Sequence, residues 1–348
     1  MGRVVLVTGV AGQLGAAAAR RLTDDPEVDK VVGVDVLPPR GDIEGVRFVR
    51  ADIRNPVIAK VLAVEDVDTV LHMSVLAIPG RGGGRGTLKE TNVIGTMQLL
   101  AACQRSSSIR NLVLMSSTAV YGASARDPGM FTEDTAPKRL PRTGYAKDCS
   151  EVEGYVRGFA RRRPDVGITV LRMCDVLGAG VTGPLAQYLR LPVVPTVLGF
   201  DPRLQLVHPD DALAALVRAT VNDLPGTYNV AGAGVLVLSQ ALRRLGRAAL
   251  PLPAAGVGPV GQALRRTSKL DLSPDQVAFL THGRVVDTTA LRERFGFVPG
   301  WSTPDTLDEF GAGVGRGPVD ASTVRQVEQR VGGVYAAVRS ARGGGSGG

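Results

Sequence analysis

The chain has 348 residues, a formal net charge of +8 and only 4% aromatic residues. This length allows one large domain or two closely packed ones, with a sizeable hydrophobic core. Arginines are spread along the chain and are not interleaved with aromatic residues, whereas a nucleic-acid-binding surface combines the two. We therefore expect no nucleic acid as a partner, and attribute the positive charge to anionic ligands and to a bias in composition.

The cysteines and the apolar segments limit the compartment. Cys103, Cys149 and Cys174 are widely spaced, and the chain has three histidines, so we expect neither a disulfide framework nor a metal site. No apolar run is long enough to span a bilayer, and the N-terminal glycines have the spacing of a nucleotide loop rather than the features of a signal peptide. These observations predict a cytoplasmic protein without a transmembrane segment.

The first sixteen residues carry the strongest functional pattern. The apolar run 4–7 predicts a buried strand, and the alanine-rich run 16–22 predicts a helix. A glycine-rich turn joins them, which is typical of a dinucleotide-binding unit in which the helix N-terminus holds the pyrophosphate. The residues expected to contact the cofactor here are Thr8, Gly9, Ala11, Gly12, Gln13, Leu14 and Gly15.

Asp35 ends the second predicted strand, residues 30–35, about 20 residues beyond the last glycine of the turn. A carboxylate there can accept hydrogen bonds from a ribose 2′-hydroxyl and would repel a 2′-phosphate. The sequence therefore favours NAD over NADP. The alternative is that Asp35 only caps the turn that follows the strand.

Strand and helix patterns alternate along the first half of the chain. Further strands are predicted at 46–49, 68–73, 111–115, 168–172 and 227–230, and short strands at 193–198 and 204–208. Helices are predicted at 56–64, 88–104, 145–161 and from 209 onward. This alternation predicts an α/β fold, a Rossmann-type doubly wound parallel sheet with a smaller, interleaved C-terminal substrate lobe. We expect the NAD-binding domain at 1–176, with segment 203–233 returning to it. The lobe would comprise 177–202 and 234–315, and a C-terminal amphipathic helix with a flexible Gly/Ser tail 316–348.

Three segments leave alternatives open. The glycine-rich run 80–86 contains Arg81, which could contact a substrate phosphate or lie in a solvated loop. The apolar stretch 250–265 could pack in the core, line a pocket for a hydrophobic substrate, or meet a membrane surface or a second subunit. Valines at helical spacing between 324 and 338 form one apolar stripe, which could dock on the body of the protein or on a partner in a homodimer.

Several motifs in order resemble one family. The nucleotide loop, Ser116–Gly122, Arg172–Gly178 and Leu206–Ala212 are similar to segments of the extended short-chain dehydrogenase/reductases, in particular the NAD-dependent epimerase/dehydratase group typified by UDP-glucose 4-epimerase. The resemblance covers about residues 4–310. It implies a nucleotide-sugar substrate and a catalytic role for Ser117, with Asp175 beside the substrate where the family has asparagine. For the cofactor it implies that Asp52 and Ile53 contact the adenine, with further contacts from Met73, Ser74, Val75, Asn92 and Tyr145.

The chain departs from that family at the proton-transfer pair. The family has a tyrosine and, four residues later, a lysine that holds the nicotinamide ribose and lowers the tyrosine's pKa; here Tyr145 is followed by Cys149. Lys147 lies about 200° around the helix from Tyr145 and faces away. Making Tyr145 a base at neutral pH requires a pKa shift of roughly 3 units, about 4 kcal/mol. That shift would come from the nicotinamide charge or a nearby arginine, or be absent; Cys149 is either a small apolar filler or a replacement base.

Three functions remain open. The first is an NAD-dependent epimerase/dehydratase-like oxidoreductase acting on a hydroxyl/ketone pair, on a nucleotide sugar or on a hydrophobic alcohol, with Ser117 and Tyr145 in the reaction. The second is a non-catalytic NAD-binding regulator or scaffold. The third is a subunit whose main role is assembly through the C-terminal stripe.

Overall fold

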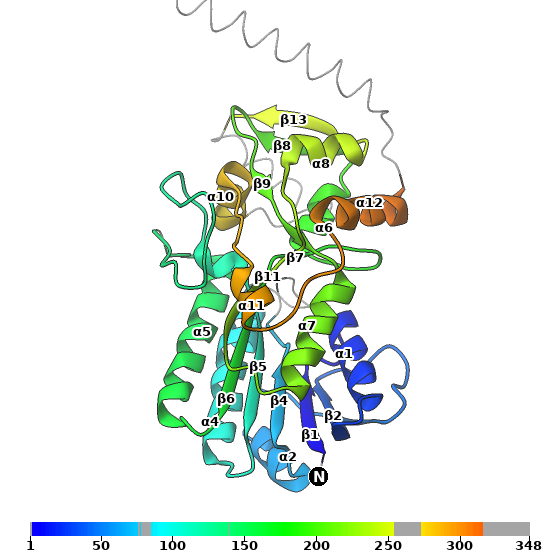
Figure 1. Ribbon diagram of the computed structural model, residues 1–348, viewed down its shortest axis with the longest axis vertical. Helices are drawn as coiled ribbons and strands as arrows, with labels where there is room; N and C mark the ends of the chain where they lie inside the picture. Colours follow the sequence, from blue (N-terminus) through cyan, green and yellow to red (C-terminus); the bar gives the residue numbers. More distant parts are fainter. Residues whose placement is uncertain (1, 76, 78–84, 139, 254–272, 316–348) are drawn as a thin grey trace, which may run out of the picture.

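The computed structural model describes residues 2–75, 77, 85–138, 140–253 and 273–315. Its centre is a parallel seven-stranded sheet in the order β11-β6-β5-β4-β1-β2-β3 (Figure 1). The apolar run in β1 has Val5, Leu6 and Val7 fully buried, as expected of a central strand covered on both faces. The strands are β1 (Arg3–Thr8), β2 (Val28–Asp35), β3 (Val46–Arg50), β4 (Thr69–His72), β5 (Asn111–Ser117), β6 (Gly167–Met173) and β11 (Gly226–Val230).

Helices cover both faces of the sheet. α1 (Gln13–Thr23) and α7 (Pro209–Val221) pack together on one face (Figure 1). α2 (Val57–Glu65), α4 (Gly95–Arg105) and α5 (Gly144–Arg162) lie on the other. The predicted doubly wound α/β sheet is confirmed, and the strand predicted at 227–230 belongs to it as β11, which pairs with β6.

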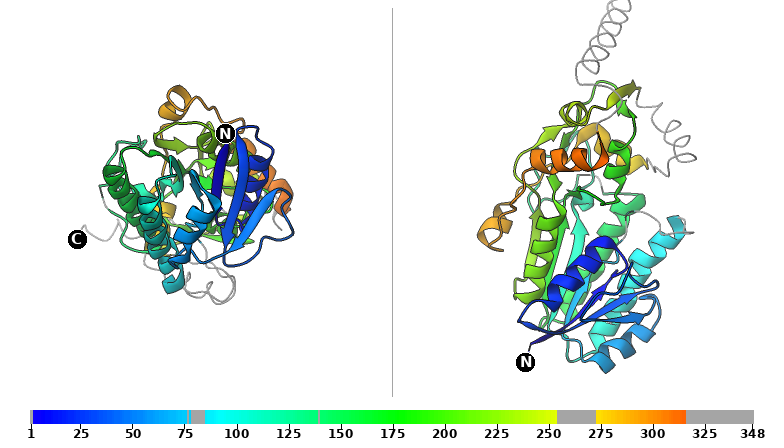
Figure 2. Two further views of the ribbon diagram at one scale, coloured as in Figure 1. Left: turned by 90° about the horizontal axis from the view of Figure 1, so that it is seen from below. Right: turned by 90° about the vertical axis from the view of Figure 1, so that its right-hand side faces the viewer.

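A smaller lobe lies beyond the carboxyl ends of the strands (Figures 1 and 2). It has its own hydrophobic cluster, which includes Tyr188, Leu204 and Phe310. Its two-stranded pairings are β10 with β7, β9 with β12 and β8 with β13. Its elements are β7 (Asp175–Val176), α6 (Pro184–Leu189), β8 (Val193–Val197), β9 (Arg203–Leu204), β10 (Leu206–Val207), β12 (Leu236–Val237), α8 (Leu238–Arg244), β13 (Ala248–Leu252), α10 (Pro274–His282) and α12 (Thr303–Val314). α11 (Thr289–Glu293) instead packs against β11 of the main sheet.

Two predicted elements differ from the structure. The single helix expected at 88–104 is α3 (Arg85–Lys89), a π-helical turn (Glu90–Ile94) and α4. The strand expected at 204–208 is divided between β9 and β10, which pair with different partners. Short-range patterns do not reveal either break, because both are set by neighbours distant in sequence.

Some predicted features lie outside the described residues. These are Arg81, most of the apolar stretch 250–265, and the valine stripe with the Gly/Ser tail. Across the described ranges, no helix is both long and apolar enough to cross a bilayer.

Candidate active site

The glycine-rich turn after β1 is shaped by two glycines. Gly9 adopts φ +77°, a left-handed conformation that other residues rarely adopt. A Cβ added to Gly15 would lie 2.1 Å from the carbonyl oxygen of Gly9, so only glycine lets α1 approach the turn this closely. The result is a compact bend that aims the N-terminus of α1 across the carboxyl edge of the sheet.

The N-terminus of α1 is free to bind an anion. Its N-cap, Gly12, provides no side-chain hydrogen bond, and the first turn contains no acidic residue. The unpaired N–H groups and the helix dipole therefore favour a phosphate group at this position. Gln13, Leu14 and Gly15 form this first turn, so α1 begins three residues before the helix predicted at 16–22.

Asp35 lies at the end of β2 beside the turn. Its Oδ2 accepts a hydrogen bond of 3.1 Å from the Ala11 N–H, and its Oδ1 accepts one of 2.7 Å from the Val36 N–H. The carboxylate is thus oriented by backbone donors and remains partly exposed. It has unused lone pairs for the hydroxyls of a ribose.

The expected adenine contacts follow β3. The carboxylate of Asp52 is held by Arg54, with an N–O separation of 2.6 Å, and this hydrogen bond lowers the pKa of Asp52. Arg54 also pairs with Glu90 at 3.1 Å. Ile53 is buried against Gly95, where an added Cβ would lie 2.7 Å from the Ile53 side chain. An adenine amino group would therefore share the Asp52 carboxylate with Arg54.

A buried histidine connects the ends of β1 and β4 to α4. His72 Nδ1 lies 2.7 Å from the Thr8 hydroxyl, and Nε2 lies 2.8 Å from the Thr96 hydroxyl. Thr96 donates its proton to the carbonyl of Asn92, so Nε2 must carry the ring proton and Nδ1 must accept from Thr8. Burial lowers the pKa of His72 to about 4, which keeps the ring neutral.

The same hydroxyl of Thr8 accepts the N–H groups of Met73 and Ser74, at 3.0 and 3.3 Å. Thr8, Met73 and Ser74 thus bring the ends of β1 and β4 together under the glycine-rich turn, with Val75 buried just beyond. The sequence predicts that these residues contact the cofactor. In the structure, the Thr8 hydroxyl also holds the ends of β1 and β4 together.

Asn92 is fully buried in the π-helical turn. Its side-chain amide donates a 3.0 Å hydrogen bond to the carboxylate of Asp148 on α5, which is also buried. π-Helical turns redirect side chains and are frequent at functional sites. Here the turn ties the α3–α4 region to the helix that carries Tyr145.

Ser117, Tyr145 and Cys149 meet at the end of β5. The Ser117 hydroxyl accepts a 3.1 Å hydrogen bond from the Ala119 N–H, and it lies close enough to Tyr145 to lower the pKa of that tyrosine. Cys149 follows Tyr145 by one helical turn, so its thiol lies on the same face of α5, where it raises the pKa of Tyr145. The structure therefore brings together the predicted serine and tyrosine, with the cysteine beside them.

The phenol and the thiol are both neutral in this environment. Burial and the neighbouring Cys149 raise the pKa of Tyr145 well above its ordinary value, while the bond from Ser117 lowers it. Burial raises the pKa of the Cys149 thiol as well. Cys149 is 1% exposed and packs in the main core, an environment that opposes a thiolate base.

Lys147 does not place its positive charge near Tyr145, and Asp175 adds a negative charge there. Lys147 turns away from Tyr145 and pairs with Glu151 on the outer side of α5, at 3.6 Å. Asp175 begins β7 within electrostatic reach of Tyr145, and its negative charge raises the tyrosine's pKa. Burial raises the pKa of Asp175, and Arg284 lowers it.

Two arginines near the site were not predicted from the sequence. Arg284, between α10 and α11, donates to the Thr118 hydroxyl at 3.2 Å and to the Gly122 carbonyl at 3.0 Å. Arg172 on β6 pairs with Glu153 of α5 at 2.7 Å beneath the site. Arg172 lies in the motif segment 172–178, but no spacing rule connects Arg284 to residues near 117.

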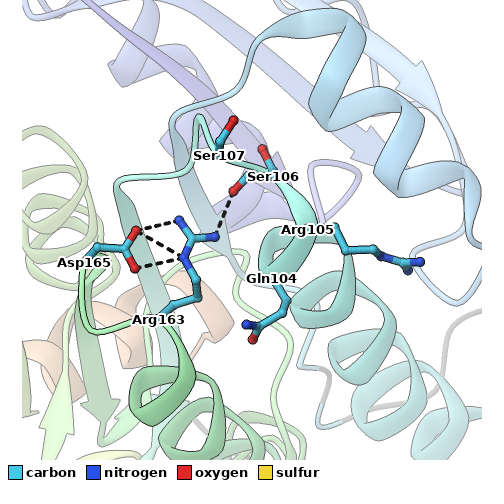
Figure 3. Close-up of a pocket in the computed structure, with 6 residues that line it drawn as sticks. All are labelled: Gln104, Arg105, Ser106, Ser107, Arg163 and Asp165. Atoms are coloured by element: carbon cyan, nitrogen blue, oxygen red, sulfur yellow. Dashed lines mark hydrogen bonds and ion pairs between the residues drawn. The ribbon is translucent and has the colours of Figure 1, made fainter.

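Surface hollows do not by themselves locate the site. The larger one, about 330 Å³, includes Ser107, Arg163 and Asp165 and lies at the amino end of β5 (Figure 3). Arg163 there bonds Asp165 and backbone carbonyls, including that of Ser106, which makes it a structural tie. The second, about 170 Å³, lies between the loop after Ser124 and the segment around Arg284, next to the turn that follows Ser117.

Comparison with known proteins identifies the family. Residues 5–231 match the model of the NAD dependent epimerase/dehydratase family. The chain belongs to this family. NAD is the family's cofactor, and the uncapped α1 terminus, the bend at Gly9 and the carboxylate of Asp35 fit it.

The family member is similar to proteins from several organisms. It is 44% identical to the protein Rv0501 of Mycobacterium tuberculosis over 94% of this chain and 89% of that protein. It is 28% identical to human short-chain dehydrogenase/reductase family 42E member 1, over 62% of this chain and 58% of that protein.

Solved structures share the fold. UDP-glucuronic acid 4-epimerase from Bacillus cereus, in complex with NAD, has a TM-score of 0.65 at 20% identity over 89% of this chain and 98% of that chain. UDP-N-acetylglucosamine 4-epimerase from Methanobrevibacter ruminantium, in complex with UDP-N-acetylmuramic acid, has a TM-score of 0.66 at 20% identity over 90% and 98%.

Proposed function

We propose that this family member is an oxidoreductase or epimerase that interconverts a hydroxyl and a ketone on a nucleotide sugar. The observation that carries the proposal is the packing of α5, which carries Tyr145, against the carboxyl end of β5 and the turn after Ser117. β5 is separated from β1 and its glycine-rich turn only by β4, so both features lie at one edge of the sheet. Ligands of doubly wound sheets bind at this edge.

Tyr145 and Ser117 would have different roles in the reaction. When bound, NAD exchanges a hydride with the carbon that bears the reacting oxygen. Tyr145 takes the hydroxyl proton when the alcohol becomes a ketone and returns it on reduction. Ser117 donates a hydrogen bond to the same oxygen. The raised pKa keeps Tyr145 protonated. A protonated phenol can donate the proton that ketone reduction needs, whereas alcohol oxidation needs a phenolate, so this state favours reduction.

Two observations support a nucleotide-sugar substrate. The hollow next to Thr118 is lined by Arg203, His282 and Arg284 and by one carboxylate, Asp127. Its volume is below the roughly 300–1,000 Å³ of typical ligand pockets, so it suits a single anionic group such as a phosphate. The similar epimerases, by their names, act on UDP sugars.

Turnover of a panel of UDP and dTDP sugars by the NAD-loaded protein, followed by product NMR, tests this function. We expect epimerised or oxidised product from at least one sugar. Tyr145→Phe should lower turnover at least 100-fold, because it removes the transferred proton, while NAD affinity stays within about twofold. Turnover that survives Tyr145→Phe would contradict the assigned role.

A non-catalytic NAD-binding regulator is the second candidate. The specific observation in its favour is Cys149 one helical turn after Tyr145, where it raises the tyrosine's pKa and the family's lysine would lower it. Tight NAD binding without product from any sugar would favour this candidate over the enzyme.

A further inference from the structure

The segment between α10 and α11 is fixed in position by a close backbone approach. Gly283 adopts φ +72°, and a Cβ added to it would lie 2.5 Å from the backbone nitrogen of Arg203. The N–H of Arg284 donates a 3.2 Å hydrogen bond to the carbonyl of Arg203. The backbone that carries Arg284 therefore rests directly on β9.

The guanidinium of Arg284 is held at the turn that follows Ser117. Its Nε donates to the Thr118 hydroxyl and its Nη1 to the Gly122 carbonyl. The ring of Phe279 lies against it, 4.8 Å from Cζ to the ring centroid. Three contacts thus fix the direction of a long side chain that would otherwise be free to rotate.

The charge of Arg284 is not cancelled by a contact ion pair. Its hydrogen-bond acceptors are neutral, and within the described ranges no carboxylate oxygen comes within 4.0 Å of it. The turn that Arg284 holds packs against α5, which carries Tyr145 and Cys149. The charge of Arg284 acts on these two groups and on Cys174 and Asp175, at the end of β6 and the start of β7. Arg203, His282 and Asp127 line the adjoining hollow.

We propose that Arg284 is a positioning residue that supplies the positive charge acting on Tyr145, in place of the lysine that is absent at position 149. This inference rests on the proposed function. A guanidinium stays protonated at all ordinary pH values, so its charge is permanent. Burial lowers the pKa of Arg284, while Tyr145, Cys149 and Asp175 raise it. Their ionised forms attract the guanidinium, and the same attraction favours the ionised form of Tyr145. Arg284 approaches from the α10–α11 side, so it replaces the charge of the lysine and not its place on α5.

The test reads the ionisation of residue 145 without a substrate. Genetically encoded 3-nitrotyrosine at position 145 absorbs visible light when ionised, and the full-length protein is titrated with NAD bound. An opposite charge within a few ångströms shifts a pKa by about 1 unit or more. We therefore expect Arg284→Gln to lower the ionisation constant of the nitrophenol, by up to about tenfold. Arg284→Lys should keep most of the effect.

A matched control and a charge swap sharpen the test. Arg190 also lies on a phenylalanine ring, with Cζ 5.1 Å from the Phe310 centroid, but in the small lobe, so Arg190→Gln should leave the titration unchanged. Cys149→Lys in the Arg284→Gln background should restore the ionisation constant at least partly. A combination that restores it indicates that charge, rather than a structural role of Arg284, is responsible.

An unchanged titration in folded, NAD-binding Arg284→Gln would overturn the inference. If that variant does not fold, Thr118→Val releases one guanidinium contact and should lower the ionisation constant by a smaller factor; no change there would equally overturn it. Failure of the proposed function is recognised separately, as absence of sugar turnover in the unmodified NAD-loaded protein. That result can occur whether or not the nitrophenol responds to Arg284.

Discussion

The ion pair beneath the site gives the sharpest stability prediction. Arg172 is 12% exposed and Glu153 is 5% exposed, and they make two contacts, Nε to Oε1 at 3.0 Å and Nη2 to Oε2 at 2.7 Å. Arg172 also donates to the Tyr121 hydroxyl at 2.8 Å. Arg172→Met leaves the buried Glu153 carboxylate with the Ser116 hydroxyl and with the exposed guanidinium of Arg157, 3.5 Å away, in place of the close two-point contact. Removing one partner of a buried pair costs about 3–5 kcal/mol, so we expect the free energy of unfolding to fall by that amount.

Urea unfolding at neutral pH measures the loss. The exposed pair of Arg244 and Asp308, 2.6 Å apart and 43% and 53% exposed, provides the control, because Arg244→Met should cost at most about 1 kcal/mol. Adding Glu153→Gln to Arg172→Met removes the stranded charge and keeps an acceptor for Ser116, so the double variant should regain at least half of the loss. Equal losses for Arg172→Met and Arg244→Met would refute this account of the buried pair.

Three further predictions concern the cofactor end of the sheet. The pKa of His72 is about 4 in the folded protein and about 6.5 in the unfolded chain, so the unfolded chain is protonated first as the pH falls. The free energy of unfolding should therefore fall by about 3 kcal/mol between pH 6.5 and pH 4. Urea unfolding of His72→Gln should show a flatter dependence on pH. Gly15→Ala must move α1 by about 1 Å and should weaken NAD binding at least tenfold by calorimetry, whereas Gly183→Ala, with open space around it, should not. Asp35→Asn removes a charged acceptor worth about 1.5–3 kcal/mol, so NAD affinity should fall about tenfold or more and the preference over NADP should shrink; an unchanged ratio would contradict the ribose contact.

Local pattern was sufficient for the sheet and for the cofactor unit. The buried run in β1, the glycines at 9, 12 and 15 and the acidic end of β2 each depend on neighbours a few residues away, so their spacing carries the information. The tyrosine and the cysteine four residues later were also placed correctly on one face of α5, because helical geometry fixes that relation. The division of residues 88–104 by a π-helical turn was missed, since Asn92 is held there by Asp148, 56 residues away.

The sequence alone determined the family, the doubly wound sheet and the absence of a lysine one turn after Tyr145. It left open which cation, if any, stands near the phenol. Only the tertiary structure brings Arg284 to Thr118, across 166 residues of chain, and buries Arg172 against Glu153. The physical reason is that backbone periodicity encodes contacts within one element, whereas a charge acts through space and its position depends on how separate segments pack.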